Sequence, residues 1–175
     1  MNKKRPLPVS EEIKIAMAEI LKGKPFSEVT VTDLVSEAGV ARASFYRNFS
    51  STADVLDDII DDLVSEFSHK VVGVITSNDQ EAWRSFLFEY IRRVRDSREI
   101  FLNAFELNVS EIFSRINGRL LALENSQTYE SIEEKYCVSA KLGLISSVLM
   151  NWIATGMTET PEEIVDYFMG FIADF

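Results

Sequence analysis

The chain of 175 residues contains one cysteine, one histidine, seven glycines and four prolines. The lone cysteine, Cys137, cannot form a disulfide within the chain, so nothing points to an oxidising compartment. One histidine and one cysteine also exclude most zinc sites, which need three or four nitrogen or sulfur ligands. So few glycines and prolines favour helices. We therefore expect a helical protein with no metal and no cofactor.

Long hydrophobic runs are also absent. The longest stretch without a charged residue runs from Leu142 to Thr158 and includes Ser146, Ser147 and Asn151. A membrane-spanning helix needs about 20 mostly apolar residues. The basic start of the chain leads into acidic residues rather than into an apolar segment, so it does not fit a secretory signal. The sequence predicts a soluble, cytoplasmic protein without a membrane partner.

Positive charge is scarce overall but not everywhere. The formal net charge is −10, which argues against a nucleic-acid partner. Residues 1–50, however, contain eight Lys or Arg against six Asp or Glu, so the acidic excess lies after residue 50. A cationic head could contact phosphate while an acidic body stays away from it. Equally, acidic composition is common and the split could carry no function, so charge alone decides nothing.

Apolar residues recur with a helical period almost throughout, and no stretch alternates with period two. The sequence predicts an all-α fold of about nine helices. Capping pairs at Thr30–Asp33, Ser51–Asp54 and Thr160–Glu163 predict three of the helix starts. The expected helices lie near residues 9–22, 31–38, 41–49, 52–75, 80–96, 98–107, 109–123 and 130–157, and from 161 onward.

Residues 30–50 read as two short helices joined by a tight turn at Gly39, the pattern of a helix-turn-helix. Phe45 and Phe49 face inward from the second helix. Arginine can bind guanine, hydroxyls can bind phosphate, and a small residue allows close approach to bases. An ordinary helical hairpin with a solvated face is the alternative. The outward side chains of the second helix are Arg42, Ala43, Ser44, Tyr46, Arg47 and Asn48.

The segment TVTDLVSEAGVARASFYRNFSSTADVL, residues 30–56, closely resembles the DNA-binding signature of TetR-type bacterial transcriptional regulators. The resemblance implies a DNA-binding domain at 1–50 and a ligand-binding and dimerisation domain at 51–175, connected through a helix at 51–75. It implies a ligand-responsive regulator, by family habit a repressor, that binds a two-fold-symmetric operator as a homodimer. Tyr46 and Ser44 are the implied phosphate contacts, and Thr30 and Thr32 should approach the DNA backbone.

Two positions depart from that signature. The family usually has a capping serine where Ala41 stands, and often a phosphate-binding lysine where Thr52 stands. The basic residues Lys3, Lys4 and Arg5 could substitute for the lysine. An alternative function therefore stays open, that of a TetR-like coactivator or ligand-binding protein that has lost strong DNA binding.

The C-terminal helices carry two apolar faces each, which suggests a four-helix interface between two copies of the chain. The alternative is that both faces are buried inside one chain. Residues 146–168 also resemble regulators related to those of dihydroxyacetone kinase operons. The residues expected at the dimer interface are Leu142, Ile145, Leu149, Trp152, Ile164, Phe168 and Phe171.

Aromatic residues are dense between 67 and 113, and by the same resemblance some could line a cavity for an apolar or aromatic effector. Plain core packing is the alternative for each of them. Four arginines between 92 and 98 could receive an anionic ligand or form a solvated face. The candidate ligand-binding residues are Phe67, Trp83, Phe86, Phe101, Phe105 and Phe113.

The sequence DDIIDD, residues 57–62, contains the D-D-x-x-D pattern of magnesium-dependent isoprenoid synthases. Those enzymes need a second aspartate-rich helix and a much longer chain. The apolar stripe of the same helix instead places the four aspartates on its outer face. We therefore expect no enzymatic activity.

Overall fold

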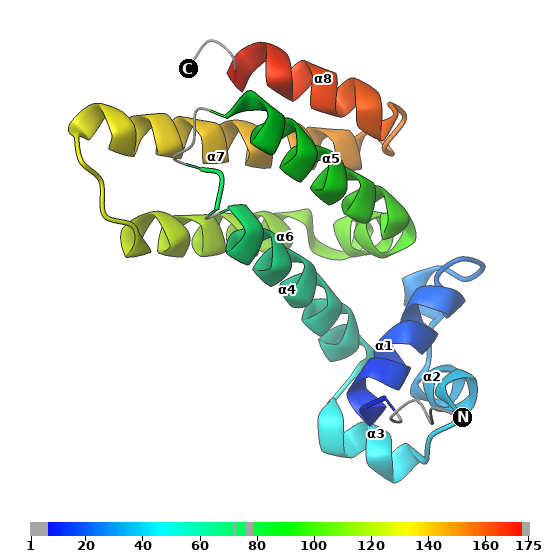
Figure 1. The fold of residues 1–175 in the computed structure, drawn as a ribbon. Helices are drawn as coiled ribbons and strands as arrows, with labels where there is room; N and C mark the ends of the chain where they lie inside the picture. The colour runs from blue at the N-terminus through cyan, green and yellow to red at the C-terminus, as the bar shows by residue number, and fades with distance from the viewer. Residues whose placement is uncertain (1–6, 72, 76–78, 173–175) are drawn as a thin grey trace, which may run out of the picture. The chain divides into compact units, whose positions relative to one another are not determined.

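Helices make up every regular element that the computed structural model describes, over residues 7–71, 73–75 and 79–172, with side chains except at 107–113, 115 and 172. The predicted all-α fold is confirmed, as eight α-helices and one short 3₁₀ helix within these ranges (Figure 1). Their bounds are α1 Val9–Ile20, η1 Phe26–Glu28, α2 Val31–Ala38, α3 Arg42–Asn48, α4 Thr52–Val71, α5 Gln80–Asp96, α6 Arg98–Ser126, α7 Ile132–Ala154 and α8 Pro161–Ile172.

The chain divides into two compact units, residues 1–61 and 62–175. In the first unit α1 packs against α2 and α3, and α2 packs against α3. Its core is formed by Ile13, Met17, Leu34 and Phe45, each with no exposed surface. Burial of these four side chains fixes the two short helices against α1, since neither helix is long enough to be stable in isolation.

The three predicted capping pairs are all present. The Thr30 and Asp33 side chains form a reciprocal capping box at the start of α2. The Ser51 hydroxyl accepts a hydrogen bond from the Asp54 amide at 3.1 Å, at the start of α4. Likewise, the Thr160 hydroxyl accepts from the Glu163 amide at 3.2 Å, at the start of α8. Local side-chain chemistry thus sets where these helices begin.

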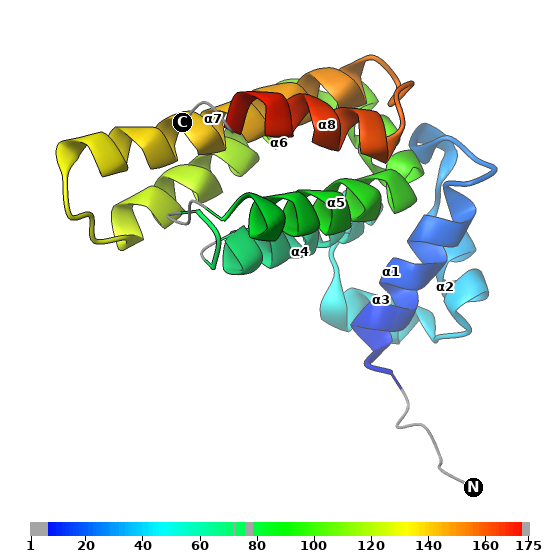
Figure 2. The same ribbon diagram turned by 45° about the horizontal axis from the view of Figure 1, so that its top comes forward.

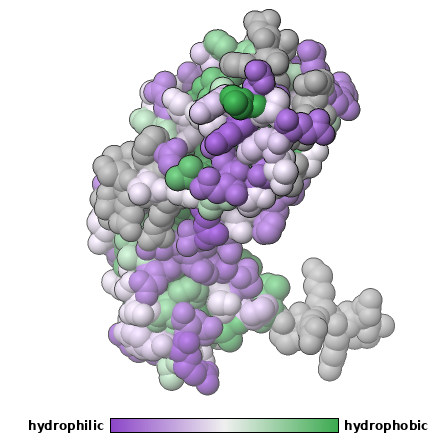
Figure 3. All heavy atoms as spheres, turned by 90° about the vertical axis from the view of Figure 1, so that its left-hand side faces the viewer, coloured by the Kyte–Doolittle hydropathy of each residue, from purple (hydrophilic) through white to green (hydrophobic). Residues whose placement is uncertain are grey.

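In the second unit α5 lies alongside α8, and α6 lies alongside α7, as Figures 1 and 2 both show. Trp83, Leu87 and Ile91 of α5 are buried, as are Leu142 of α7 and Phe168 of α8. On the face of the molecule drawn in Figure 3, hydrophilic side chains predominate and hydrophobic ones form small separate groups.

Two predicted helix boundaries were wrong. The segments expected at 98–107 and 109–123 form one helix, α6, because no glycine or proline interrupts the chain between them. The helix expected to reach residue 75 ends at Val71, where Gly73 opens a turn by donating its amide to the Lys70 carbonyl at 3.2 Å. Glycine residues commonly end helices in this way.

Helix α7 is the one helix in the described ranges that is long and apolar enough to cross a membrane by length and composition. Half of its most apolar window is buried inside the protein. Core helices of soluble proteins meet the same criteria, so this finding is weak evidence for a membrane span.

Candidate nucleic-acid interface and apolar cavity

The turn between α2 and α3 depends on Gly39, which has φ 66° and ψ 27°. A side chain is strained in this left-handed conformation, whereas glycine adopts it freely. The Val40 amide donates to the Val35 carbonyl at 3.1 Å and closes the end of α2. Val40 and the extended residue Ala41 follow, and α3 begins at Arg42, so the two helices are joined by the short turn that the sequence predicts.

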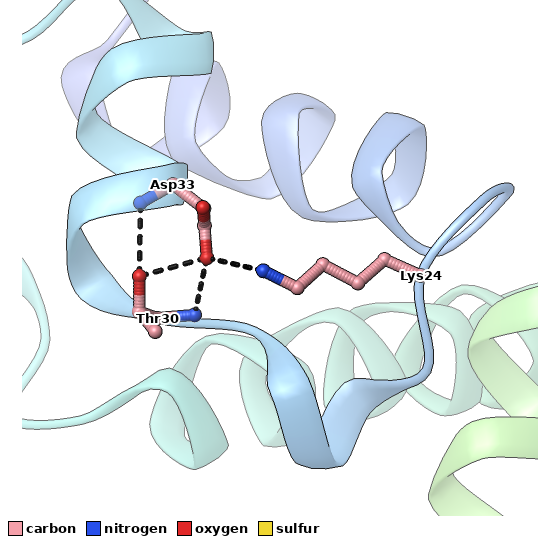
Figure 4. A network of polar contacts seen from close by, with 3 residues as sticks. All are labelled: Lys24, Thr30 and Asp33. Atoms are coloured by element: carbon pink, nitrogen blue, oxygen red, sulfur yellow. Dashed lines mark hydrogen bonds and ion pairs between the residues drawn. The ribbon is translucent and has the colours of Figure 1, made fainter.

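The start of α2 is fixed by a network around one carboxylate (Figure 4). Asp33 Oδ2 accepts from the Thr30 amide at 2.8 Å, from the Thr30 hydroxyl at 2.7 Å and from Lys24 Nζ at 2.8 Å. The hydrogen bond from Lys24, followed by those from Thr30, lowers the pKa of Asp33 to about 2. The Thr30 hydroxyl therefore serves as a helix cap in the free protein.

One side of the exposed face of α3 is organised by Arg42. Its guanidinium donates to the Thr32 hydroxyl at 3.2 Å and to the Tyr46 hydroxyl at 3.1 Å. It also lies 5.5 Å from the centroid of the Tyr46 ring. These contacts link α2 to α3 through exposed side chains and place a cation, a phenol and a hydroxyl next to one another.

The other side of α3 is organised around Ser44. Arg47 donates to the Ser44 hydroxyl at 2.7 Å, and the Asn48 amide group donates to the Ser44 carbonyl at 2.8 Å. Arg47 and Asn48 are exposed, and Ser44 is half-buried. The Ser44 hydroxyl thus holds Arg47 in the free protein.

Ala43 lies between these two groups. Successive residues of an α-helix are rotated by about 100°, so Ala43 faces outward with Arg42 and Tyr46 on one flank and Arg47 on the other. Ala43 is exposed, whereas Phe45 on the opposite face is completely buried. The outward face of α3 is therefore cationic at both flanks and small at its centre, which suits close approach to a polyanion.

The two departures from the signature have different structural consequences. Ala41 is the N-cap of α3 and makes no side-chain capping bond, so the expected loss of a cap is confirmed. Thr52 is the first residue of α4 and is half-buried. The basic residues Lys3, Lys4 and Arg5 lie outside the described residues, so their proposed role stays a prediction.

Residues 16–59 match the family described as bacterial regulatory proteins, tetR family. This segment contains α2, the Gly39 turn and the whole of α3. The N-terminal part of the chain is therefore similar to TetR-family proteins. The helix-turn-helix described above lies wholly within the matched segment.

A curated relative supports the same conclusion. Over 86 residues the chain is 34% identical to the HTH-type transcriptional regulator EthR of Mycolicibacterium smegmatis. That segment is 49% of this chain but only 36% of EthR, so the match spans about a third of the relative's length.

Solved structures of transcriptional regulators share the fold over nearly the whole chain. The dihydroxyacetone kinase operon activator DhaS has a TM-score of 0.66 at 13% identity, over 94% of this chain and 93% of its own. The TetR family repressor AlkX from Dietzia, implicated in biodegradation of n-alkanes, has a TM-score of 0.64 at 18% identity, over 98% and 96%. At these identities the comparison shows a shared fold. The same holds for DhaS, to whose group of regulators residues 146–168 show a resemblance.

The second unit of the chain contains an apolar cavity. Its walls come from four helices, and about 460 Å³ inside and at its mouth is not filled by protein atoms. Of its lining residues only Tyr90 and Ser146 carry a polar side-chain group. The lining residues are Val64 and Phe67 of α4, Tyr90 and Val94 of α5, Phe101, Ile116 and Leu120 of α6, and Ile145, Ser146, Leu149, Met150 and Ile153 of α7.

The candidate ligand-binding aromatics are distributed unevenly around this cavity. Phe67 and Phe101 line it. Trp83 and Phe86 are buried behind it, where the Phe86 ring lies 5.5 Å from the Phe67 ring and 6.0 Å from that of Trp83. Phe105 is half-buried and does not line it. The Phe113 side chain lies outside the described residues.

The residues expected at a dimer interface are mostly inside the single chain. Only Phe171 stays exposed, at 45%, and Ile145 and Leu149 line the cavity instead. Burial of these side chains needs no second chain, which favours the alternative that both helix faces pack internally, and their place at a dimer interface stays a prediction. The buried ones, none more than 8% exposed, are Leu142, Ile145, Leu149, Trp152, Ile164 and Phe168.

Three of the four arginines between residues 92 and 98 make hydrogen bonds or ion pairs to other residues of the chain. Arg95 donates to the Met157 carbonyl, and Arg98 donates to the Gly156 carbonyl at 3.2 Å. Both carbonyls lie in the left-handed turn after α7. Arg93 pairs with Glu66 at 3.6 Å. These arginines stabilise the end of α7 and the surface between α4 and α5, and none of them lines the apolar cavity.

Proposed function

We propose that this chain is a DNA-binding transcriptional regulator of the cytoplasm, without enzymatic activity, that places α3 in the major groove of its operator. The observation that supports this most is the outward face of α3, where exposed Arg42 and Arg47 flank the small Ala43. Arginine forks onto the O6 and N7 atoms of guanine, and alanine allows the helix to approach the base edges. The match of residues 16–59 to the TetR family supports the same reading.

Phosphate contacts supply most of the affinity in such complexes. Tyr46 is half-exposed, at 52%, and its hydroxyl already pairs with Arg42. We assign Tyr46 and Ser44 to phosphates, with Thr30 and Thr32 near the backbone at the start of α2 and Asn48 at the far end of α3. In the free protein the Arg42 guanidinium donates to Thr32 and Tyr46. On DNA it would exchange these contacts for hydrogen bonds to a base, because it has five N–H donors.

The regulator acts as a homodimer in this proposal, since a two-fold-symmetric operator needs two recognition helices. The exposed aromatic pair Tyr167 and Phe171 on α8 supports an interface there. The rings lie 5.0 Å apart and are 53% and 45% exposed. The outward face of α8, which includes the predicted interface residue Phe171, is therefore the candidate interface.

Ligand response is proposed through α4. Its C-terminal half contributes Val64 and Phe67 to the cavity, and its N-terminal half belongs to the DNA-binding unit. An effector in the cavity that favours one position of α4 would shift the population between DNA-binding and released states. Repression, with release of DNA on effector binding, is the proposed outcome.

The groove assignment is tested by replacing Arg42 and Tyr46 separately with Ala and measuring operator affinity. We expect each variant to weaken binding by about tenfold or more, since one base or phosphate contact is worth about 1–3 kcal/mol. Glu37→Ala, at an exposed position on α2, is the control and should not weaken binding. Unchanged affinity in both α3 variants, with folding intact, would refute the assignment.

A further inference from the structure

The apolar cavity contains a buried hydroxyl that makes no hydrogen bond. Ser146 of α7 is only 4% exposed, and its Oγ has no hydrogen-bond partner among the described residues. A buried polar group without a partner is destabilising, and most such groups in folded proteins are paired. The exception therefore requires an explanation, and its place in the wall of a cavity provides one.

Two other hydroxyls of this unit, one in α4 and one directly after α7, form hydrogen bonds to backbone carbonyls. Ser68 donates to the Val64 carbonyl at 2.9 Å, and Thr155 donates to the Asn151 carbonyl at 3.0 Å. Both use the carbonyl four residues earlier, the usual partner of a serine or threonine within a helix. Ser146 is on a regular helix with the same option, yet its hydroxyl is not bonded in this way. Its hydroxyl is thus available to a molecule in the cavity.

A water molecule would be a poor occupant. A buried water is usually held by about three hydrogen bonds to polar groups. Among the described lining residues only the side chains of Ser146 and Tyr90 carry polar groups. An occupant with one polar atom and an apolar remainder matches this lining better than water does.

A charged occupant is also disfavoured. None of the lining residues carries a carboxylate, an ammonium or a guanidinium group. Burial, together with the nearby charge of Glu66, raises the pKa of the Tyr90 hydroxyl, so Tyr90 is neutral at physiological pH. An ionised ligand would lose its hydration here without gaining a counter-charge.

The cavity is narrow. Its enclosed volume is about 30 Å³. A ligand of ten or more heavy atoms must therefore spread the walls, and flexible Met150 is well suited to yield. Because α4 forms part of those walls, spreading them acts on the helix that begins directly after the recognition helix.

We propose that this cavity binds an uncharged, mainly hydrophobic small molecule with one hydrogen-bonding oxygen, which pairs with the Ser146 hydroxyl. This inference rests on the proposed ligand response and specifies the chemistry of the ligand. Recognition is divided between the apolar walls, which supply affinity, and Ser146, which distinguishes an alcohol, phenol or carbonyl compound from a plain hydrocarbon of the same shape.

The test uses three probes that share one two-ring body: naphthalene, 1-naphthol and 1-naphthoate. Binding of each to the full chain is measured by titration calorimetry at pH 7. In Ser146→Ala we expect the Kd of 1-naphthol to rise about tenfold, the loss of one neutral hydrogen bond, while that of naphthalene changes less than twofold. We expect 1-naphthoate to bind the unmodified protein at least tenfold more weakly than 1-naphthol.

The neighbouring residue provides the matched control. Ser147 is exposed, so Ser147→Ala should leave the affinity for all three probes unchanged. Ser146→Leu, which removes the hydroxyl and fills the space, should abolish binding of both neutral probes. If Ser146→Ala weakens naphthalene and 1-naphthol equally, or if 1-naphthoate binds most tightly, the proposal is wrong.

The same samples are assayed for operator binding, which separates the two levels of the proposal. Ser146-dependent binding of 1-naphthol in a protein that does not bind DNA would support the cavity chemistry and overturn the regulator function. Absence of binding by all three probes in a protein that binds its operator would overturn the cavity proposal and leave the regulator function intact.

Discussion

The two units of the chain are held together over very different sequence distances. In residues 1–61 the contacts that set helix starts are local, with Thr30 bonded to Asp33 and Ser51 bonded to Asp54, and the Lys14–Asp58 ion pair at 3.1 Å spans 44 positions. In residues 62–175 the comparable contacts join distant segments, as in the Arg84–Asp166 bond at 2.8 Å, which spans 82 positions. The starts of α2 and α4 are therefore specified locally, whereas the pairing of α5 with α8 depends on a contact between distant segments.

The largest effect in the first unit should follow from removing its central aromatic. Phe45 is completely buried, so Phe45→Ala should destabilise that unit by about 3–5 kcal/mol. Denaturant unfolding followed by circular dichroism measures this. Tyr46→Ala, at the neighbouring but half-exposed aromatic, should change stability by less than 1 kcal/mol. Equal destabilisation by both would contradict the assigned faces of α3.

The oligomeric state tests the second unit. Tyr167→Glu adds a charge to the exposed pair on α8 and should convert dimers to monomers in sedimentation, with the thermal midpoint of the monomer little changed. Phe88→Glu, at an aromatic on α5 that is 36% exposed, is the control and should remain dimeric. A Tyr167→Glu protein that stays dimeric would place the interface elsewhere.

A smaller effect on the free energy of unfolding is expected from the difference in capping between the starts of α2 and α3. Helix α2 has a full capping box, whereas α3 begins at Ala41 with no side-chain cap. Ala41→Ser restores an N-cap and should stabilise the first unit by about 1 kcal/mol in denaturant unfolding. No gain in stability would show that the turn geometry prevents the serine from capping α3.

Acidification should weaken the first unit through its capping carboxylate. The pKa of Asp33 is lowered to about 2 by Lys24 and Thr30, below its ordinary value of 3.8. Its stabilisation is therefore complete above about pH 4 and is lost as the pH falls toward 2. Thermal unfolding between these pH values measures the loss. Asp33→Asn should show a shallower pH dependence there, and an unchanged slope would assign the acid sensitivity to other groups.

The same contrast explains how much could be predicted. The Thr30 box, the turn at Gly39 and the outward face of α3 are encoded within 20 residues, so the sequence alone predicted them. The sequence also predicts an apolar face through Ile145 and Leu149. Periodicity does not reveal which part of the protein covers such a face. These two residues line a cavity with helices α4, α5 and α6. Ser146 was missed because a serine in an apolar helix has no distinguishing pattern until its neighbours are known.

Sequence-specific DNA binding is tested most directly by fluorescence anisotropy. The protein is titrated against labelled DNA from upstream of its own gene and against a scrambled duplex, at several salt concentrations. We expect tight binding to the native duplex alone, with the logarithm of the binding constant falling linearly as the logarithm of the salt concentration rises. Equal and weak binding to both duplexes, with the protein folded, would contradict operator recognition at this DNA and favour the coactivator function.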